Sequence, residues 1–259
     1  MKPAAPDLAA YAGALALSYA VKHHCSTAGA DELAFLLRPT AAMVEFATGH
    51  AFSAERGAGF ISRELHVVIA PVCSGANFLV VAFTALVLGF SARARGNVRK
   101  VAWFCASATL AYLATLLINA ARITLSLRLA EPGESPLSGE AAHRLLGIVT
   151  YLAGLLALYA VAGRLFSKRT LSASDFAVAL GVYTAVTLLT PWLRGAGARA
   201  EYWTHASVVA SVVTATALLL SVRQRVRSLS RNANADGRDA DRNGHGDCGR
   251  LRGSNQAVQ

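Results

Sequence analysis

Apolar residues along this chain are gathered into long runs that short polar segments separate. The five most continuous runs are 73–90, 101–121, 143–166, 174–192 and 203–222. Each is close to the ~20 residues that a helix needs to cross a bilayer. A helix that is apolar on every side belongs in a membrane or in the centre of a large core. The pattern therefore predicts an all-α fold, a polytopic bundle of membrane helices.

Two less regular apolar runs precede these five. Residues 8–21 are typical either of the apolar part of a signal peptide or of an uncleaved first span, and the weakly charged start favours the span. Residues 33–49 contain Arg38, Pro39 and Glu45, which favours an interfacial or re-entrant helix over a full span. Counting the first run, the sequence predicts about six transmembrane helices.

The overall composition supports a membrane protein. Of the 259 residues, 54% are hydrophobic and 15% are charged, whereas soluble domains carry about 25% charged residues. This excludes a soluble nucleotide-binding enzyme, a disulfide-stapled secreted domain and a disordered scaffold. The four cysteines show no paired spacing that would indicate a disulfide framework. We expect neither a cofactor nor a metal site.

The positive charges predict how the helices are oriented. The formal net charge is +10, and the basic residues gather in alternate connections between the spans. These clusters are Arg93, Arg95, Arg99 and Lys100, then Arg164, Lys168 and Arg169, then Arg223, Arg225, Arg227 and Arg231. Because cytoplasmic loops carry an excess of Lys and Arg, all three clusters are predicted to be cytoplasmic, as are both termini. The charge therefore does not indicate a nucleic-acid partner.

The last part of the chain differs from the rest. Residues 223–259 are rich in Arg, Asp and Gly and have no apolar period. Such a composition cannot bury enough apolar surface to fold by itself. We therefore predict a membrane domain over 1–222 and a disordered cytoplasmic tail over 223–259.

Three polar residues stand at the ends of successive predicted spans. Cys73 opens one span, Arg122 closes the next, and His143 opens the one after. Since these helices alternate in direction, all three residues are predicted to lie at the same outer surface of the membrane. A thiol, a permanent cation and an imidazole at one depth form a candidate site for cysteine-dependent hydrolysis.

The sequence around Cys73 suits a nucleophile. Pro71 is typical of a helix start, where exposed N–H groups stabilise the negative charge of a thiolate. The small residues Ser74 and Gly75 leave room for an acyl group, and their backbone N–H groups are candidate donors to an oxyanion. The alternative is that Cys73 is an inert buried thiol, which is the usual role of a membrane cysteine.

The other two residues have matching roles. His143 is a candidate to accept the thiol proton and return it to the leaving amine. Arg122, always charged, suits an oxyanion or a substrate carboxylate. Asn119 precedes Arg122 by three residues, on the same helical face, and is a candidate to orient it. Structural alternatives are an arginine that reaches the lipid head groups and a histidine that caps a helix.

These motifs resemble those of the exosortase/archaeosortase family of membrane cysteine transpeptidases. The shared pattern is Cys73-Ser74-Gly75, then Asn119-Ala120-Ala121-Arg122, then His143, in that order and at similar spacing. The stretches 37–49 and 147–152 most resemble the exosortase K branch. The resemblance covers residues 33–166, and the last two spans and the tail add nothing specific to it.

The resemblance implies a cysteine protease or transpeptidase of protein sorting in a bacterial inner membrane, acting on its periplasmic side. Its substrates would be secreted proteins with a C-terminal signal made of a short motif, a membrane helix and a basic cluster. Cys73 would form an acyl-enzyme, and its acyl group would then be transferred to an unknown acceptor nucleophile or to water. Besides these substrates and the acceptor, the chain would contact membrane lipid.

Two other functions are compatible with the same residues. One is a non-catalytic membrane assembly or transport subunit, although transport favours ionisable residues near the span centres and these are almost absent. The other is a membrane cysteine hydrolase that acts on different acyl substrates, such as lipids or glycans.

Overall fold

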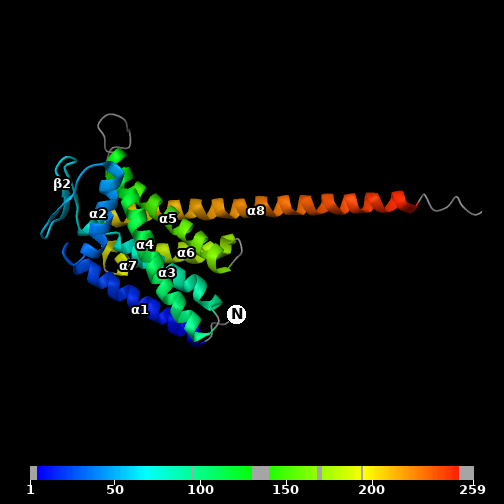
Figure 1. The fold of residues 1–259 in the computed structure, drawn as a ribbon, viewed down its shortest axis with the longest axis horizontal. Coiled ribbons are helices and arrows are strands. Elements are labelled where there is room, and N and C mark those ends of the chain that lie inside the picture. The colour runs from blue at the N-terminus through cyan, green and yellow to red at the C-terminus, as the bar shows by residue number, and fades with distance from the viewer. Residues whose placement is uncertain (1–4, 95, 130–139, 168–170, 194, 251–259) are drawn as a thin grey trace, which may run out of the picture. The chain divides into compact units, whose positions relative to one another are not determined.

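The structure is a computed structural model that describes residues 5–94, 96–129, 140–167, 171–193 and 195–250, and it is mostly helical (Figure 1). Its helices are α1 (Ala5–Thr27), α2 (Ala34–Thr48), α3 (Ala76–Phe90), α4 (Asn97–Leu129), α5 (Glu140–Ser167), α6 (Ala173–Thr184), α7 (Thr190–Leu193) and α8 (Ala200–Arg250). Three strands lie between α2 and α3, namely β1 (Ser53–Glu55), β2 (Gly59–Ser62) and β3 (Val67–Ile69). A 3-10 turn, Pro71–Cys73, precedes α3, and a π-helical turn, Ala185–Leu189, joins α6 to α7.

Five helical segments among the described residues are long and apolar enough to cross a membrane. They are Pro71–Arg93, Asn97–Leu129, His143–Phe166, Asp175–Leu193 and Ala200–Val226. They coincide with the five continuous apolar runs. The helical class of the prediction is confirmed for the described residues, and the five apolar helices are compatible with a multi-pass membrane protein. The helix α1 is formed over the predicted first span but is not one of the five. The total of six spans and the cytoplasmic placement of both termini stay predictions.

The chain divides into two compact units, Met1–Thr214 and Ala215–Gln259. The first unit contains the helix bundle and the strands. In the second unit, α8 continues as helix to Arg250, which differs from the absence of regular structure that composition predicts from 223 onward. No proline follows residue 191, so nothing in this segment removes a backbone donor and ends the helix. The domain boundary at 222 stays a prediction.

Several charges that the sequence analysis uses fall outside the described residues. They are Arg95, Lys168 and Arg169.

The helix α3 is the centre of the bundle and packs against α1, α4, α5 and α6. Its sequence is apolar on nearly every face, which suits a helix that neighbours surround. The Tyr159 ring of α5 fills the space where Gly89 has no side chain. A buried hydrogen bond of 2.7 Å joins Ser18 Oγ to Thr84 Oγ1 and ties α1 to α3.

The helix α2 packs one face on α4 and exposes the other. The buried face holds Leu36, Leu37, Thr40, Ala41 and Val44. The spacing of these residues by three and four places them on one side of the helix. Arg38 and Glu45 are exposed. The helix has 15 residues, too few to cross a bilayer, and its placement at the interface stays a prediction.

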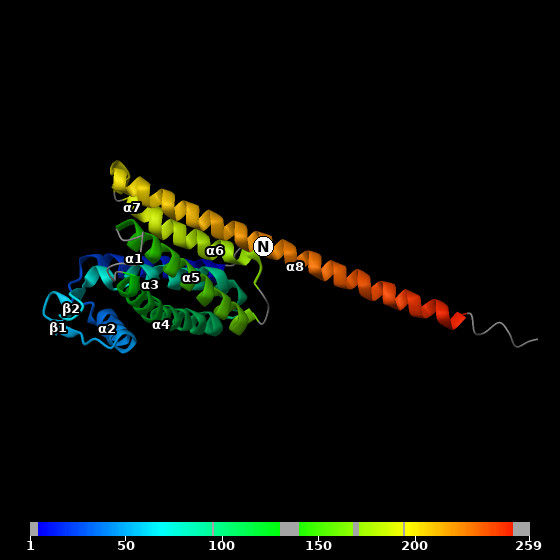
Figure 2. The same ribbon diagram turned by 90° about the horizontal axis from the view of Figure 1, so that it is seen from above.

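A small antiparallel sheet, in the order β1-β2-β3, is an addition to the predicted all-α fold. The three-residue turn between β1 and β2 places Gly57 at φ 75°, in the left-handed region that such hairpins require. The strands are only three or four residues long, so their alternation is too short to stand out between apolar runs of membrane length. The sheet lies beside α2 at one end of the bundle (Figures 1 and 2).

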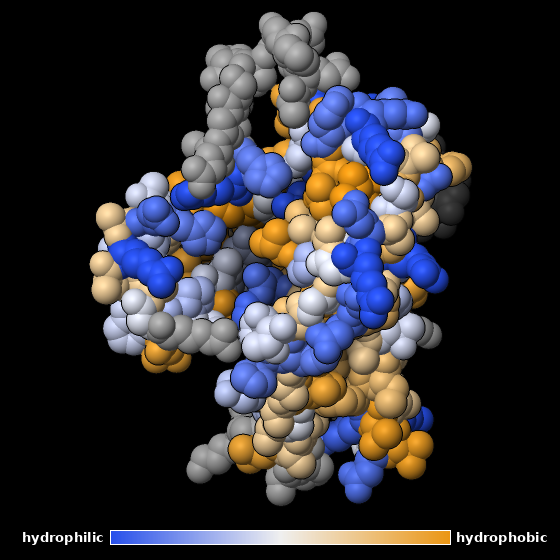
Figure 3. Space-filling view, turned by 90° about the vertical axis from the view of Figure 1, so that its left-hand side faces the viewer, coloured by the Kyte–Doolittle hydropathy of each residue, from blue (hydrophilic) through white to orange (hydrophobic). Residues whose placement is uncertain are grey.

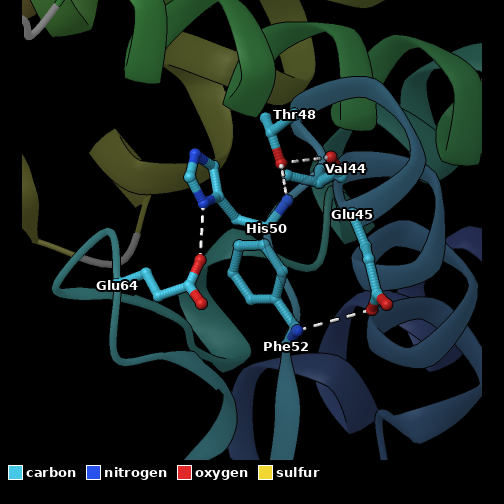
Figure 4. A network of polar contacts seen from close by, with 6 residues as sticks. All are labelled: Val44, Glu45, Thr48, His50, Phe52 and Glu64. Carbon is cyan, nitrogen blue, oxygen red and sulfur yellow. Dashed lines mark hydrogen bonds and ion pairs between the residues drawn. The ribbon is translucent and has the colours of Figure 1, made fainter.

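Polar contacts hold the end of α2 to the chain that enters the sheet (Figure 4). The Thr48 hydroxyl donates to the Val44 carbonyl at 2.8 Å, and His50 Nδ1 lies 2.7 Å from Glu64 Oε2. The Phe52 N–H donates to Glu45 Oε2 at 3.4 Å. Figure 3 looks onto this end and shows hydrophilic side chains spread over much of it. These contacts join the end of α2 to the segment before β1 and to the segment after β2.

Candidate active site

Cys73 ends the 3-10 turn that leads from β3 into α3. The Cys73 N–H donates to the Ala70 carbonyl at 2.8 Å, and the Ser74 N–H donates to the Pro71 carbonyl at 3.1 Å. The Ser74 N–H is therefore engaged within the turn, which corrects the prediction that it is a free donor for an oxyanion. The Gly75 N–H, by contrast, has no hydrogen-bond partner among the described residues.

Gly75 is the residue that lets the turn approach α4 closely. It is the N-cap of α3 and has φ 74°, a conformation that L side chains rarely adopt. A Cβ added at Gly75 would lie 3.1 Å from Asn119 Cγ and 3.1 Å from Thr115 Cγ2. Both the backbone angle and the available space therefore require glycine, and the third residue of the Cys-Ser-Gly motif has a physical explanation.

Asn119 connects the turn that contains Cys73 to Arg122. Its side chain is fully buried in α4. The amide Nδ2 donates to the Cys73 carbonyl at 2.6 Å, and Oδ1 accepts from the Tyr151 hydroxyl at 2.8 Å. Oδ1 also accepts from Arg122 Nε at 3.3 Å. A buried amide is stable only when its polar atoms are paired. These three hydrogen bonds therefore hold the Asn119 side chain in one orientation and restrain Cys73, Arg122 and Tyr151 relative to it.

Arg122 is held beside the same network. Besides its bond to Asn119, its guanidinium carbon lies 5.4 Å from the centroid of the Tyr151 ring, within the range of a cation–π interaction. These two contacts orient the side chain. The predicted role of Asn119, to position Arg122, agrees with this geometry.

His143 lies at the start of the described part of α5 and shares a cavity with Arg122. The cavity has a volume of about 390 Å³. Gly147 and Tyr151 follow at intervals of four residues, on the same face of α5. A Cβ at Gly147 would lie 3.9 Å from Arg122 Cδ. The described face of α5 between His143 and Tyr151 is thus directed at Arg122.

The Cys73 thiol itself is half-buried against apolar neighbours. It packs on a cluster that includes Leu33, Ile69 and Ile123, and it is a free thiol. Within the part of the chain that the structure describes, no hydrogen bond joins the thiol to His143. The structure therefore brings the Cys73 backbone, Asn119 and Arg122 together, while His143 meets Arg122 across the cavity.

Tyr151 is a residue of the network that the sequence analysis does not single out. Its hydroxyl contacts Asn119, and its ring is stacked on Phe78 of α3 with centroids 5.3 Å apart. It also lies within electrostatic reach of the Cys73 thiol. The signal that could have found it is its spacing of eight residues from His143, two helical turns along one face.

Of the other cysteines, Cys25 packs against the same apolar cluster as Cys73. Cys105 is exposed on α4, and the side chain of Cys248 is not described. Burial raises the pKa of the Cys25 thiol, and the nearby Lys22 ammonium partly lowers it again. Cys25 should therefore react more slowly at neutral pH than an exposed thiol, because less of it is ionised.

The chain was also compared with known proteins. No family model, no curated protein and no solved structure matches it. The resemblance to exosortases therefore stays a hypothesis that the motifs carry, and the function has to be argued from the site.

Proposed function

We propose that this chain is a membrane cysteine transpeptidase of protein sorting, of the exosortase type. It would cleave the C-terminal sorting signal of secreted proteins at the periplasmic face of a bacterial inner membrane. The observation that carries the proposal is the network at Asn119, which contacts the Cys73 carbonyl at 2.6 Å and Arg122 at 3.3 Å. The two residues are 49 positions apart in sequence, and a buried amide holds both.

In the proposed reaction, the Cys73 thiolate attacks the carbonyl carbon of the scissile peptide bond. A C–S bond forms, the C–N bond breaks, and the C-terminal membrane helix leaves as an amine. The resulting thioester is then opened by an acceptor amine or by water, which regenerates the thiol. The thiolate is a strong nucleophile near neutral pH, which suits it to this two-step route.

The neighbouring groups supply the proton transfer and the charge stabilisation. His143 takes the thiol proton and returns it to the leaving amine, directly or through one water. Hydrogen bonds of this kind are often long before substrate is bound, which is compatible with the separation of His143 from the thiol. Arg122 stabilises the oxyanion, and the Gly75 N–H, two residues after the nucleophile, is the proposed backbone donor.

The function can be tested in the native host. Membrane and secreted proteins from cells with the wild-type chain, Cys73→Ala or His143→Ala are compared by mass spectrometry of their C-termini. We expect defined proteins to lose a C-terminal helix in wild type only. Loss of the general acid–base should slow processing by about 10²- to 10⁴-fold. Cys105→Ala is the matched control, because it removes an exposed thiol from α4 and should process normally.

Normal C-termini with Cys73→Ala, at wild-type protein levels in the membrane, would contradict the proposal. A non-catalytic assembly subunit would then be the better account.

A further inference from the structure

The cavity beside His143 is lined by more cations than the proposed reaction uses. Five basic side chains line it, namely Lys22, Arg122, His143, Arg144 and His205. They come from α1, α4, α5 and α8, so the chain gathers them from four separate helices. Among the described residues that line the cavity, none is acidic.

The basic groups are positioned rather than scattered. The Lys22 ammonium donates to the Asn77 side-chain oxygen, which ties α1 to the start of α3. Arg122 is oriented by Asn119. Arg144 lies close enough to His205 for the two groups to interact electrostatically. Like charges that line one space repel one another, and an anion bound among them would reduce that repulsion.

The other walls of the cavity carry tyrosine rings and apolar side chains. The Tyr202 hydroxyl donates to the Leu188 carbonyl at 3.1 Å, and the Tyr183 hydroxyl donates to the Ile148 carbonyl at 3.4 Å. The π-helical turn Ala185–Leu189 supplies part of this wall. Pro191 follows the turn, and a proline disrupts the hydrogen bond to the residue four positions before it. Such single π turns are frequent at functional sites.

We propose that this cavity binds a phosphate group. Lys22, Arg122 and Arg144 supply three permanent positive charges, together with donors for more oxygens than a carboxylate offers. A carboxylate has two oxygens and one charge, whereas a phosphate has three or more oxygens and up to two charges. The apolar and aromatic walls suit a phosphate that is attached to a larger organic group. The headgroup of a lipid and a soluble phosphate compound share this chemistry.

This site does not depend on the proposed function. It includes Arg122 and His143, but it needs no nucleophile. Binding is therefore measured on the Cys73→Ala protein, in which the proposed reaction is abolished. Loss of protein processing and loss of phosphate binding can then be told apart.

The test uses the full chain with Cys73→Ala, purified in a neutral detergent and freed of lipid. Inorganic phosphate is titrated against it by calorimetry, with KCl at matched ionic strength. We expect saturable binding that Arg144→Gln and Lys22→Gln each weaken by about tenfold or more, as for loss of a charge-assisted hydrogen bond. Arg144→Lys, which keeps the charge, should bind better than Arg144→Gln. Arg128→Gln removes a cation of α4 that lines a different groove and should bind as the parent does.

A second arm separates the two sources of the phosphate. Native mass spectrometry of the protein with phosphatidylglycerol shows a retained lipid that inorganic phosphate displaces if the group is a lipid headgroup. If phosphate binds but the lipid is not retained at this site, the ligand is a soluble phosphate compound. The proposal is overturned if phosphate does not bind, if Arg128→Gln weakens binding as much as Arg144→Gln does, or if a peptide carboxylate binds in place of phosphate.

Discussion

Asn119 lies where α4 meets the turn that carries Cys73, and its amide contacts three neighbours. An amide is suited to this position because it both donates and accepts. It donates to the Cys73 carbonyl and accepts from Tyr151 and Arg122. Substitutions that disturb these contacts without touching the thiol should therefore affect the proposed reaction.

The first such substitution is Gly75→Ala. At φ 74° the alanine would be strained by ~1–2 kcal/mol, and its Cβ would displace the Asn119 side chain. We expect the protein to insert and fold but to lose most of its processing activity, measured as trimmed C-termini in the native host. Gly49→Ala is the matched control. Gly49 has φ 75° and nothing within 4 Å of an added Cβ, so this variant should be strained equally yet remain active. Equal activity in the two variants would contradict the proposed role of Asn119.

The second substitution is Tyr151→Phe, which keeps the ring but removes the hydroxyl that donates to Asn119. Loss of one neutral hydrogen bond costs ~0.5–1.5 kcal/mol, so processing should slow by about two- to tenfold. The Tyr112 hydroxyl donates to the Phe35 carbonyl at 2.8 Å and not to Asn119. Tyr112→Phe should therefore leave the rate of processing unchanged, and a similar loss in both variants would argue against a specific role for Tyr151.

At the residue scale, the sequence predicts the candidates but not all their contacts. Cys73, Arg122 and His143 stand out because they are polar residues at the ends of apolar runs. Tyr151 does not stand out, because tyrosines are common at the ends and faces of membrane helices. The engagement of the Ser74 N–H could not be predicted either, since it depends on a turn of three residues.

At the scale of elements, the ends of α3 and α6 are joined by an ion pair. Arg93 Nη2 donates to Asp175 Oδ1 at 2.8 Å, and the other carboxylate oxygen accepts from the backbone N–H and the hydroxyl of Ser172. The Asp175 side chain is 11% exposed. One carboxylate thus caps α6 and anchors it to α3.

We predict that Asp175→Asn lowers the free energy of unfolding by ~1.5–3 kcal/mol, because it weakens charge-assisted hydrogen bonds in a mostly buried place. Thermal unfolding in a neutral detergent measures the loss. The pair of His50 and Glu64, 2.7 Å apart, has side chains that are 42% and 68% exposed. Glu64→Gln should therefore change the stability by less than ~1 kcal/mol. A larger loss from Glu64→Gln than from Asp175→Asn would refute this ranking.

The helices could be predicted from the sequence pattern, whereas the sheet could not. The run 73–90 is part of the helical segment Pro71–Arg93, and the run 143–166 corresponds to His143–Phe166. A long apolar run favours a helix of membrane-spanning length. The sheet between α2 and α3 is held by backbone pairing and by contacts such as His50 with Glu64. Pairing between short strands leaves no comparable trace in the sequence.

At the scale of the whole molecule, the bundle supports a membrane protein whose polar groups meet at one end. Cys73 lies in the turn just before α3, while Arg122 lies in the last turns of α4 and His143 near the start of α5. Helices that alternate in direction bring these ends together. The topology therefore agrees with the contacts at Asn119. The central claim of the proposal is that Cys73 is the nucleophile.

Capture of the acyl-enzyme tests that claim most directly. Hydroxylamine is added to native-host cells that contain the wild-type chain or Cys73→Ala, and the C-termini of secreted proteins are analysed by mass spectrometry. Hydroxylamine opens a thioester to a hydroxamate, so the account predicts trimmed proteins that end in a C-terminal hydroxamate in wild type only. Trimmed C-termini without a hydroxamate in wild type, or the same hydroxamates with Cys73→Ala, would contradict it.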